Sequence, residues 1–350
     1  MYEEALRWFD DALNEDPDYA AAEAGKSRAL RGGLRFEPLE RRPAVLTEAI
    51  AAARRAIQLA PELADGYVQL GQAQEVAGDE QAALTQFLKA AEIAPDDPDT
   101  LGALASLYAG QGRLLDAIRL ARLAQVLEPS DANRLSQLSA YYKRIGLLDQ
   151  AIIGFEHAWG EITSHPGRRV CMAGGAALLA GQAARARAAT EQTLALDPGS
   201  PIGAACVIGI FNSLRDAASS IMLLDQHAEY FETNSSADFV WALSQSGDQA
   251  RLERLLVIAE RRLTDELPRA SGASLAYSLG QIAMLRGQSE SALDHLERGV
   301  QQGWRQYRVL AVEPIWDPVR DNPRFIALEE QVDADLARMR AELAAMDAAL

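Results

Sequence analysis

Apolar and polar positions along the chain follow helical spacing, and the pattern repeats every 34 residues. Large side chains such as Tyr67 and Leu70 recur three or four positions apart, which is typical of a helix with one buried face. Glycine permits the left-handed turn that ends a helix, and proline cannot continue a helix. Both residue types keep the same period, most clearly at Gly78, Gly112 and Gly146, and at Pro61, Pro95 and Pro129. The pattern therefore predicts successive pairs of helices.

Small residues occupy the positions at which the two helices of a pair must approach closely. In the unit that ends at Pro95 they are Gly71 in the first helix and Ala83 in the second, and Phe87 fills the space beside them. A single pair cannot bury its own apolar face, so neighbouring pairs must stack. We therefore expect an all-α solenoid.

The same residues resemble the tetratricopeptide repeat (TPR) family, whose unit is a helix–turn–helix of 34 residues. The matching positions in the first clear unit are Tyr67, Leu70, Gly71, Ala83, Phe87 and Pro95. The next two units match at Leu101, Leu104, Ala105, Tyr108, Ala117, Ala121 and Pro129, and at Leu135, Leu138, Tyr142, Ala151 and Phe155. The resemblance implies a right-handed α-solenoid of TPR helix–turn–helix repeats, and its C-terminal end is expected to carry a capping helix.

The period weakens outside these units, and we divide the chain accordingly. The segments are the second helix of a truncated repeat (1–17), a TPR with an inter-helix insertion (18–61), three well-matched TPRs (64–165), divergent helical repeats (167–270), a further TPR (273–306), and a C-terminal cap and helix (307–350). This division corresponds to roughly eight helical pairs. The insertion, RGGLRFEPLERRPAVL, is expected to lengthen the loop between the helices of its pair.

The chain begins in the middle of a repeat. Ala5, Phe9, Ala12 and Pro17 occupy the positions of a second helix, and no first helix precedes them. Because natural solenoids usually end in a polar cap, we expect this chain to be the C-terminal part of a longer protein. The alternative is that this helix packs on the far side of its unit or on another subunit.

The C-terminal segment is expected to close the open end of the last pair with aromatic side chains, namely Trp304, Tyr307, Trp316 and Phe325. Apolar residues then follow with helical steps, at Leu328, Val332, Leu336, Met339, Leu343 and Met346. We expect this apolar stripe to pack back on the solenoid. Homodimerisation through a short coiled coil of the C-terminal helix is the alternative.

The C-terminal segment also resembles the tail that follows TPRs in bacterial winged-helix transcriptional regulators and adenylate/guanylate-cyclase-type signalling proteins. The residues that carry this likeness are Pro314, Trp316, Asp317, Pro318, Arg320, Asp321, Pro323, Arg324, Phe325 and Leu328. In such proteins the effector domain lies at the N-terminal end, so the resemblance implies an architecture and no chemistry.

Composition narrows the classes of partner. The net charge of −16 argues against binding of DNA, RNA or an anionic membrane through the bulk surface. The opening MYEEALRW is acidic and therefore unlike a signal peptide, and the longest apolar run, PIGAACVIGIF, is too short to span a bilayer. We expect a cytoplasmic protein, or a periplasmic one if a transmembrane helix precedes it in the parent protein.

Sequence motifs for chemistry are weak, and we predict no enzyme, no cofactor and no metal site. AGKS at residues 24–27 ends like a phosphate-binding loop, but Ala20 stands where that motif requires glycine. The histidines are scattered, without metal-ligand spacing, at His157, His165, His227 and His295. Cys171 and Cys206 fall at similar places in successive first helices. They either face each other or are two separate small residues, and we expect the second.

The resemblance implies a concave groove lined by the first helices, at the second, fifth, ninth and twelfth positions of each unit. The partner-binding residues predicted on this basis are Asp65, Val68, Gln72, Glu75, Asp99, Ser106, Asn133, Ser136 and Lys143. Some TPR proteins hold the C-terminal carboxylate of a peptide with lysine and asparagine at the fifth and ninth positions of their units. In this chain the fifth positions are Val68, Gly102 and Ser136, and the ninth positions are Gln72, Ser106 and Ala140. The residues therefore do not favour such a carboxylate clamp. The groove is thus small-sided and mildly acidic, and it suits a polar or basic segment or a helix. The alternative is that some of these positions merely face solvent.

Two functions are compatible with these observations. The first is a non-enzymatic scaffold that binds a partner peptide or helix on its concave face. The second is the sensory or regulatory segment of a larger bacterial signalling protein, either a winged-helix regulator or a class III cyclase.

Overall fold

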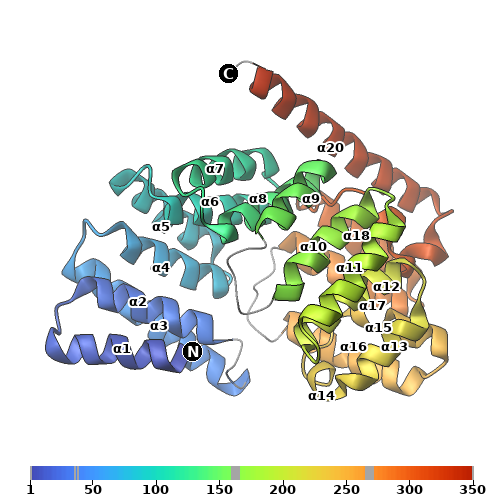
Figure 1. Ribbon diagram of the computed structural model, residues 1–350, viewed down its shortest axis with the longest axis horizontal. Coiled ribbons are helices and arrows are strands. Elements are labelled where there is room, and N and C mark those ends of the chain that lie inside the picture. The colour runs from blue at the N-terminus through green and yellow to red at the C-terminus, as the bar shows by residue number, and fades with distance from the viewer. Residues whose placement is uncertain (1, 35–36, 38, 159–165, 265–271, 349–350) are drawn as a thin grey trace.

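The computed structural model describes the whole chain except residues 1, 35–36, 38, 159–165, 265–271 and 349–350. Every regular element within the described ranges is a helix, as the periodicity predicts, and consecutive helices pack in pairs (Figure 1). After α1 (Tyr2–Glu15), the pairs are α2 (Ala20–Gly33) with α3 (Arg42–Leu59), α4 (Ala64–Val76) with α5 (Glu80–Ile93), α6 (Pro98–Gly110) with α7 (Leu114–Leu127), α8 (Ala132–Ile145) with α9 (Leu148–His157), α10 (Pro166–Leu179) with α11 (Ala183–Leu196), α12 (Pro201–Ser213) with α13 (Ala217–Gln226), α15 (Ala237–Ser246) with α16 (Gln249–Thr264), and α17 (Gly272–Leu285) with α18 (Ser289–Gln301).

The remaining elements are short, apart from the last helix. They are η2 (Leu39–Arg41), α14 (Ala228–Phe231), α19 (Val309–Val312), η4 (Pro314–Val319) and α20 (Pro323–Ala348). The insertion near residue 40 differs from its expected form. Helix α2 continues to Gly33, and α3 already begins at Arg42 and has 18 residues. Much of the expected loop is therefore helix.

The two helices of the first well-matched pair approach each other closely at Gly71. A Cβ atom placed there would lie 2.5 Å from Cε1 of Phe87 and 3.1 Å from the carbonyl oxygen of Ala83. Phe87 and Ala83 are fully buried, so neither has free space into which to move. The small residue at this position is therefore what allows α4 and α5 to meet, as the repeat pattern implies.

Adding a methyl group at this contact gives a matched test. We expect Gly71→Ala to lower the free energy of unfolding by about 1–3 kcal/mol, because overpacking outweighs the better helix propensity of alanine. Gly209 lies within α12, and a Cβ atom placed there would have open space for 4 Å around it. Gly209→Ala should therefore raise stability by up to about 1 kcal/mol. Urea unfolding of both variants measures the two changes in the free energy of unfolding. If both variants were stabilised or both destabilised, the close packing at Gly71 and the open space at Gly209 would be contradicted.

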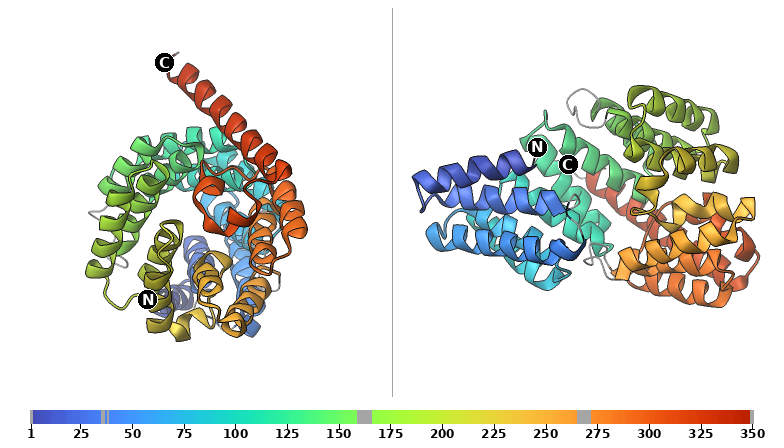
Figure 2. Two further views of the ribbon diagram at one scale, coloured as in Figure 1. Left: turned by 90° about the vertical axis from the view of Figure 1, so that its right-hand side faces the viewer. Right: turned by 90° about the horizontal axis from the view of Figure 1, so that it is seen from below.

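The chain winds as two layers, with first helices inside and second helices outside (Figures 1 and 2). The first helices α2, α4 and α6 contact one another in succession, and so do α10, α12, α15 and α17. The winding brings the end of the chain back to its middle, where the backbone N–H of Tyr307 donates to the carbonyl oxygen of Arg144 at 2.9 Å. The solenoid is thus closed on itself and not an open rod, because one buried apolar cluster joins residues of α6, α7 and α8 to residues of α17, η4 and α20.

The C-terminal cap is formed largely as expected. Trp304, Trp316 and Phe325 are buried, and the rings of Tyr277 and Trp304 stack with their centroids 4.2 Å apart. Tyr307 is partly buried against the same cluster, and its ring also lies against Gly146 in the turn between α8 and α9.

The stripe on α20 packs on the solenoid. Its buried members are Leu328, Val332, Leu336 and Leu343, and Met339 is partly buried against the same cluster. Two polar contacts hold the distal half of the helix. Arg340 donates to the carbonyl oxygen of Ile145, and Arg122 pairs with Asp347. The stripe is thus covered within the chain, as expected, and homodimerisation through the C-terminal helix stays a prediction.

The cysteines correct another expectation. Cys171 in α10 and Cys206 in α12 are joined by a disulfide bond, with their Cα atoms 6.2 Å apart. The interpretation of two separate small residues is wrong. The physical reason is that similar places on successive first helices face each other across the contact between neighbouring pairs.

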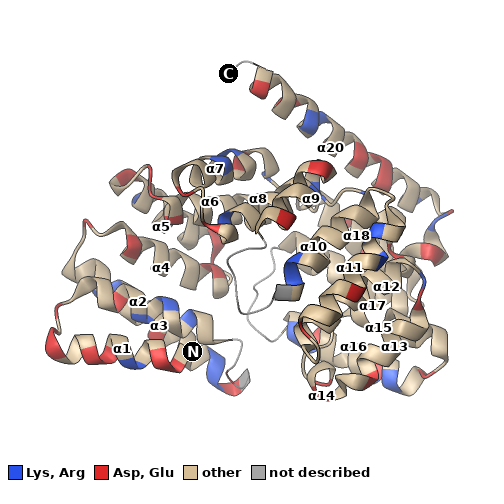
Figure 3. Ribbon diagram, viewed as in Figure 1, with Lys and Arg blue, Asp and Glu red and all other residues tan. Residues whose placement is uncertain are grey.

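Acidic and basic residues are interspersed over the helices (Figure 3). Many of them pair between neighbouring elements. Arg286, in the turn after α17, pairs with Glu253 of α16 at 2.8 Å, and Arg324 of α20 pairs with Asp294 of α18 at 2.7 Å. Ion pairs between exposed groups contribute little to stability, so the buried apolar clusters remain the main source of the fold.

Candidate functional site

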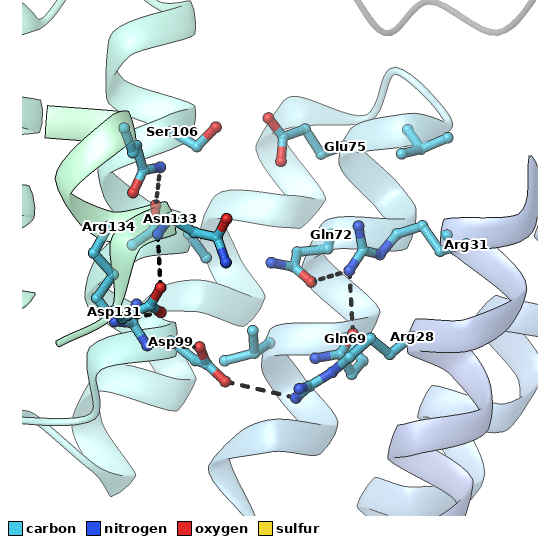
Figure 4. A pocket seen from close by; sticks show the side chains of 16 residues that line it. Arg28, Arg31, Gln69, Gln72, Glu75, Asp99, Ser106, Asp131, Asn133 and Arg134 are labelled. Atoms are coloured by element: carbon cyan, nitrogen blue, oxygen red, sulfur yellow. Dashed lines mark hydrogen bonds and ion pairs between the residues drawn. The ribbon is translucent and has the colours of Figure 1, made fainter. Parts of the chain in front are cut away.

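A groove of about 910 Å³ lies on the inner side of the N-terminal half of the solenoid. Its walls come from α2, α4, α6 and α8, because first helices form the inner layer (Figure 4). Val68 is 1% exposed and lies beneath the polar side chains, together with Gly102 and Ala103. The groove therefore has a small-sided, partly apolar floor and polar walls.

Two carboxylates at one end of the groove share the guanidinium of Arg28. Its Nη2 atom lies 2.8 Å from the carboxylate of Asp65 and 3.6 Å from that of Asp99. Gln69 also donates to Asp65, at 2.8 Å. These contacts bridge three successive first helices, and they neutralise the two acidic residues that open α4 and α6.

Arg134 organises the opposite wall from α8. Its guanidinium pairs with Asp99 at 2.9 Å and with Glu128 at 2.5 Å, and it donates to the carbonyl oxygen of Pro98 at 2.7 Å. The carboxylate of Asp131 lies 3.5 Å from the same guanidinium. It also accepts a hydrogen bond from the backbone N–H of Asn133, so Asp131 caps the N-terminus of α8. The side chain of Arg134 is only 10% exposed, so it is a structural part of this wall.

The centre of the groove is formed by α4. Gln72 accepts a hydrogen bond of 2.6 Å from Arg31 of α2. One turn further along, Glu75 is half-buried. Burial raises the pKa of the Glu75 carboxyl above its usual value, the positive charge of Arg31 opposes this rise, and the negative charge of Glu80 adds to it. Protonation of Glu75 is therefore easier than that of an exposed glutamate.

The structure brings most of the predicted partner-binding residues together. Those that line the groove are Val68, Gln72, Glu75, Asp99, Ser106 and Asn133. Asp65 lies outside the lining and is engaged by Arg28. Ser136 and Lys143 also lie outside the lining, and burial beside Arg144 lowers the pKa of Lys143.

Sequence reasoning missed several groove residues. Gln69, Ala103, Arg134 and Gln137 each follow by one residue a position that the family pattern marks. The longer ones reach back to the preceding helix, since Gln137 donates to the carbonyl oxygen of Gly102 at 3.1 Å. Their position one step after the marked residue is the signal that could have found them. The contributors from α2, namely Arg28, Arg31 and Gly32, were missed because the insertion disturbs the repeat register there.

Other candidate chemistry receives a structural explanation. Residues 24–27 lie within α2, where Lys26 pairs with Asp10 at 2.6 Å and Ser27 donates to the carbonyl oxygen of Ala49 at 2.7 Å. His165 lies outside the described residues. In the described ranges, His, Cys, Asp and Glu nowhere gather in a group of three that could hold a metal ion. The described helices are each too short or too polar to cross a bilayer.

Comparisons with known proteins concern the fold. No family model and no curated protein matches the chain. The human IFIT1 dimer with PPP-AAAA is similar with a TM-score of 0.55 and 18% identity, over 86% of this chain and 68% of that one. The APC/C hetero-tetramer Cut9–Hcn1 is similar with a TM-score of 0.50 and 14% identity, over 94% of this chain and 58% of that one. YrrB, described as a TPR protein with an unusual peptide-binding site, gives a TM-score of 0.39 and 17% identity over 56% and 95%.

The architecture, together with the two likenesses at TM-scores of 0.55 and 0.50, defines the fold. The chain is an all-helical, right-handed solenoid built from stacked helix pairs. Its fold is that of the tetratricopeptide-repeat proteins.

Proposed function

We propose that this protein is a scaffold that binds a segment of another polypeptide in the groove of α2, α4, α6 and α8. The observation that carries the proposal is the groove itself, whose polar side chains point into open space over a small-sided floor (Figure 4). Its volume of about 910 Å³ is comparable to that of established ligand clefts. Its walls span four successive first helices, which suits an elongated ligand such as a peptide or a helix.

Two arginine substitutions in the groove test this proposal. We expect the double variant Gln72→Arg, Glu75→Arg to lose most captured partners, because two bulky cations narrow the groove and reverse its local charge. The measurement is affinity capture followed by mass spectrometry, with the full chain as bait. Gln81→Arg, Glu92→Arg is the matched control, since both residues are exposed on the outer helix α5 and the change in charge is the same.

The outcomes are distinct when folding is monitored. Circular dichroism should show the same helix content for both double variants. If the wild type, the groove variant and the control captured the same partners equally well, the partner would not bind in the groove. Loss of capture by the outer-face control alone would place the partner surface on the second helices instead.

The second hypothesis, a sensory segment of a bacterial winged-helix regulator or cyclase, stays a prediction. The in-frame sequence upstream of Met1 tests it directly. The compartment also stays a prediction. Because disulfide bonds persist in oxidising compartments, the bond between Cys171 and Cys206 favours the periplasmic alternative over the cytoplasm.

A further inference from the structure

Most charges in the groove are already used within the protein. Arg28 pairs with Asp65 and Asp99, and Arg134 pairs with Asp99 and Glu128. These guanidinium groups are therefore poorly placed to receive an acidic partner, and these carboxylates are neutralised without one. A ligand gains little from either set, because it would have to break an existing pair.

Glu75 is different from the other groove carboxylates. Within the described part of the chain, its carboxylate makes no hydrogen bond or ion pair. The cationic side chain whose charge acts on Glu75, Arg31, donates hydrogen bonds to Gln72 at 2.6 Å and to Gln69 at 3.5 Å. A half-buried carboxylate without a partner is costly when ionised. A cation supplied from outside would remove that cost.

The surroundings of Glu75 suit a long basic side chain. Figure 4 shows the carboxylate pointing across the groove toward Ser106, and Asn133 reaching in from the opposite wall. Between these walls the floor consists of Val68, Gly102 and Ala103. The alkyl stem of a lysine or arginine can lie on such a floor while its charged end meets the carboxylate. The side-chain amide of Asn133 remains for the backbone of the partner.

We infer that the groove recognises a polypeptide segment through one basic side chain, lysine or arginine, which pairs with the carboxylate of Glu75. This inference rests on the proposed scaffold function and names the chemistry of its partner. It assigns Glu75 as the residue that determines specificity.

A library of displayed random peptides tests the inference with the full chain as bait. Peptides captured by the wild type should be enriched in lysine or arginine at one position. Glu75→Gln should lose that enrichment, and Glu75→Lys should exchange it for aspartate or glutamate at the same position. Glu92→Gln is the control, because Glu92 is exposed on α5 and should leave the selected peptides unchanged.

One selected peptide then provides a double-mutant cycle. Replacing its basic residue by norleucine should weaken binding to the wild type about tenfold, as expected for loss of a partly buried ion pair. Glu75→Gln should bind the lysine and norleucine peptides with nearly equal affinity, because the pairing group is absent. Melting curves should show that Glu75→Gln is folded.

The possible results separate this inference from the function on which it rests. Peptides that are captured, that are lost from the Gln72→Arg, Glu75→Arg variant and that lack a preferred basic residue would overturn the inference alone. Failure to capture any peptide would overturn the proposed function and the inference together.

Discussion

Replacing Trp316 with alanine is expected to lower the free energy of unfolding by about 3–5 kcal/mol, as is typical of a large aromatic residue removed from a core. The indole is fully buried. Its ring centroid lies 5.8 Å from that of Tyr277 and 5.9 Å from that of Phe325, and Nε1 donates to the hydroxyl of Tyr277 at 3.2 Å. The variant therefore leaves a cavity and a tyrosine hydroxyl without its donor.

The effect should extend beyond the last pair, because the same apolar cluster joins α20 to α7 and α8. We expect hydrogen exchange in Trp316→Ala to accelerate first in α20 and α18, and then in the turn at Gly146 that Tyr307 covers. Thermal unfolding measures the overall loss of stability. Trp8→Ala is the control, since Trp8 is 66% exposed on α1 and its removal should change little. Equal melting temperatures for the two variants would show that the cap does not stabilise the solenoid.

The helices and turns could be predicted from the sequence because the repeat is local. Gly146, for example, ends α8 with a φ angle of 88°, a conformation that glycine adopts without strain. The position of Gly146 in the 34-residue period predicts that turn. Likewise, Gly71 and Phe87 are only 16 positions apart, within one unit, and their contact follows from the small–large pattern of one helix pair.

Closure of the solenoid could not be predicted in the same way. It depends on contacts such as that between Arg144 and the carbonyl oxygen of Arg305, which are 161 residues apart and follow no period. These contacts result from small rotations between neighbouring pairs, added over several repeats. A repeat pattern identifies each pair, but it does not give the sum of those rotations.

The groove could be predicted in part, because the position of a residue within its repeat determines whether its side chain faces the inner or the outer side of the solenoid. Gln72 and Glu75 lie on the inner side because α4 follows the family pattern closely. Which groove charges are neutralised was not predictable, because Arg28 and Arg134 reach neighbouring helices through long side chains. The availability of Glu75 for a partner thus emerges only when the side chains of three helices are placed together.

The acidity of Glu313 leads to a prediction about pH. Its carboxylate accepts hydrogen bonds from Tyr277 at 2.5 Å and from Gln281 at 2.9 Å. Burial raises the pKa of Glu313 to about 7, and the negative charge of Asp238 adds to the rise, while these hydrogen bonds oppose it. The guanidinium of Arg320 donates to the backbone carbonyl of Glu313 at 3.0 Å and does not neutralise the carboxylate.

The direction of the effect follows from proton binding. Because the pKa of Glu313 is higher in the folded chain than the usual value of 4.5, the folded state holds its proton more tightly than the unfolded state. The contribution of this proton to stability is complete below about pH 4.5 and is lost as the pH rises through about 7. The cap is therefore expected to be weaker at pH 8 than at pH 5, by up to about 3 kcal/mol from this group.

Glu313→Gln should remove this dependence, since glutamine still accepts from Tyr277 and cannot ionise. We expect the variant to be more stable than the wild type at pH 8, with most of the difference gone at pH 5. Urea unfolding followed by tryptophan fluorescence measures it, because Trp304 and Trp316 lie in the same cluster. Glu330→Gln, an exposed change on α20, is the control and should leave the pH profile of the wild type intact. A Glu313→Gln variant that is less stable than the wild type at pH 8 would mean that the ionised carboxylate stabilises the cap, which contradicts the burial argument.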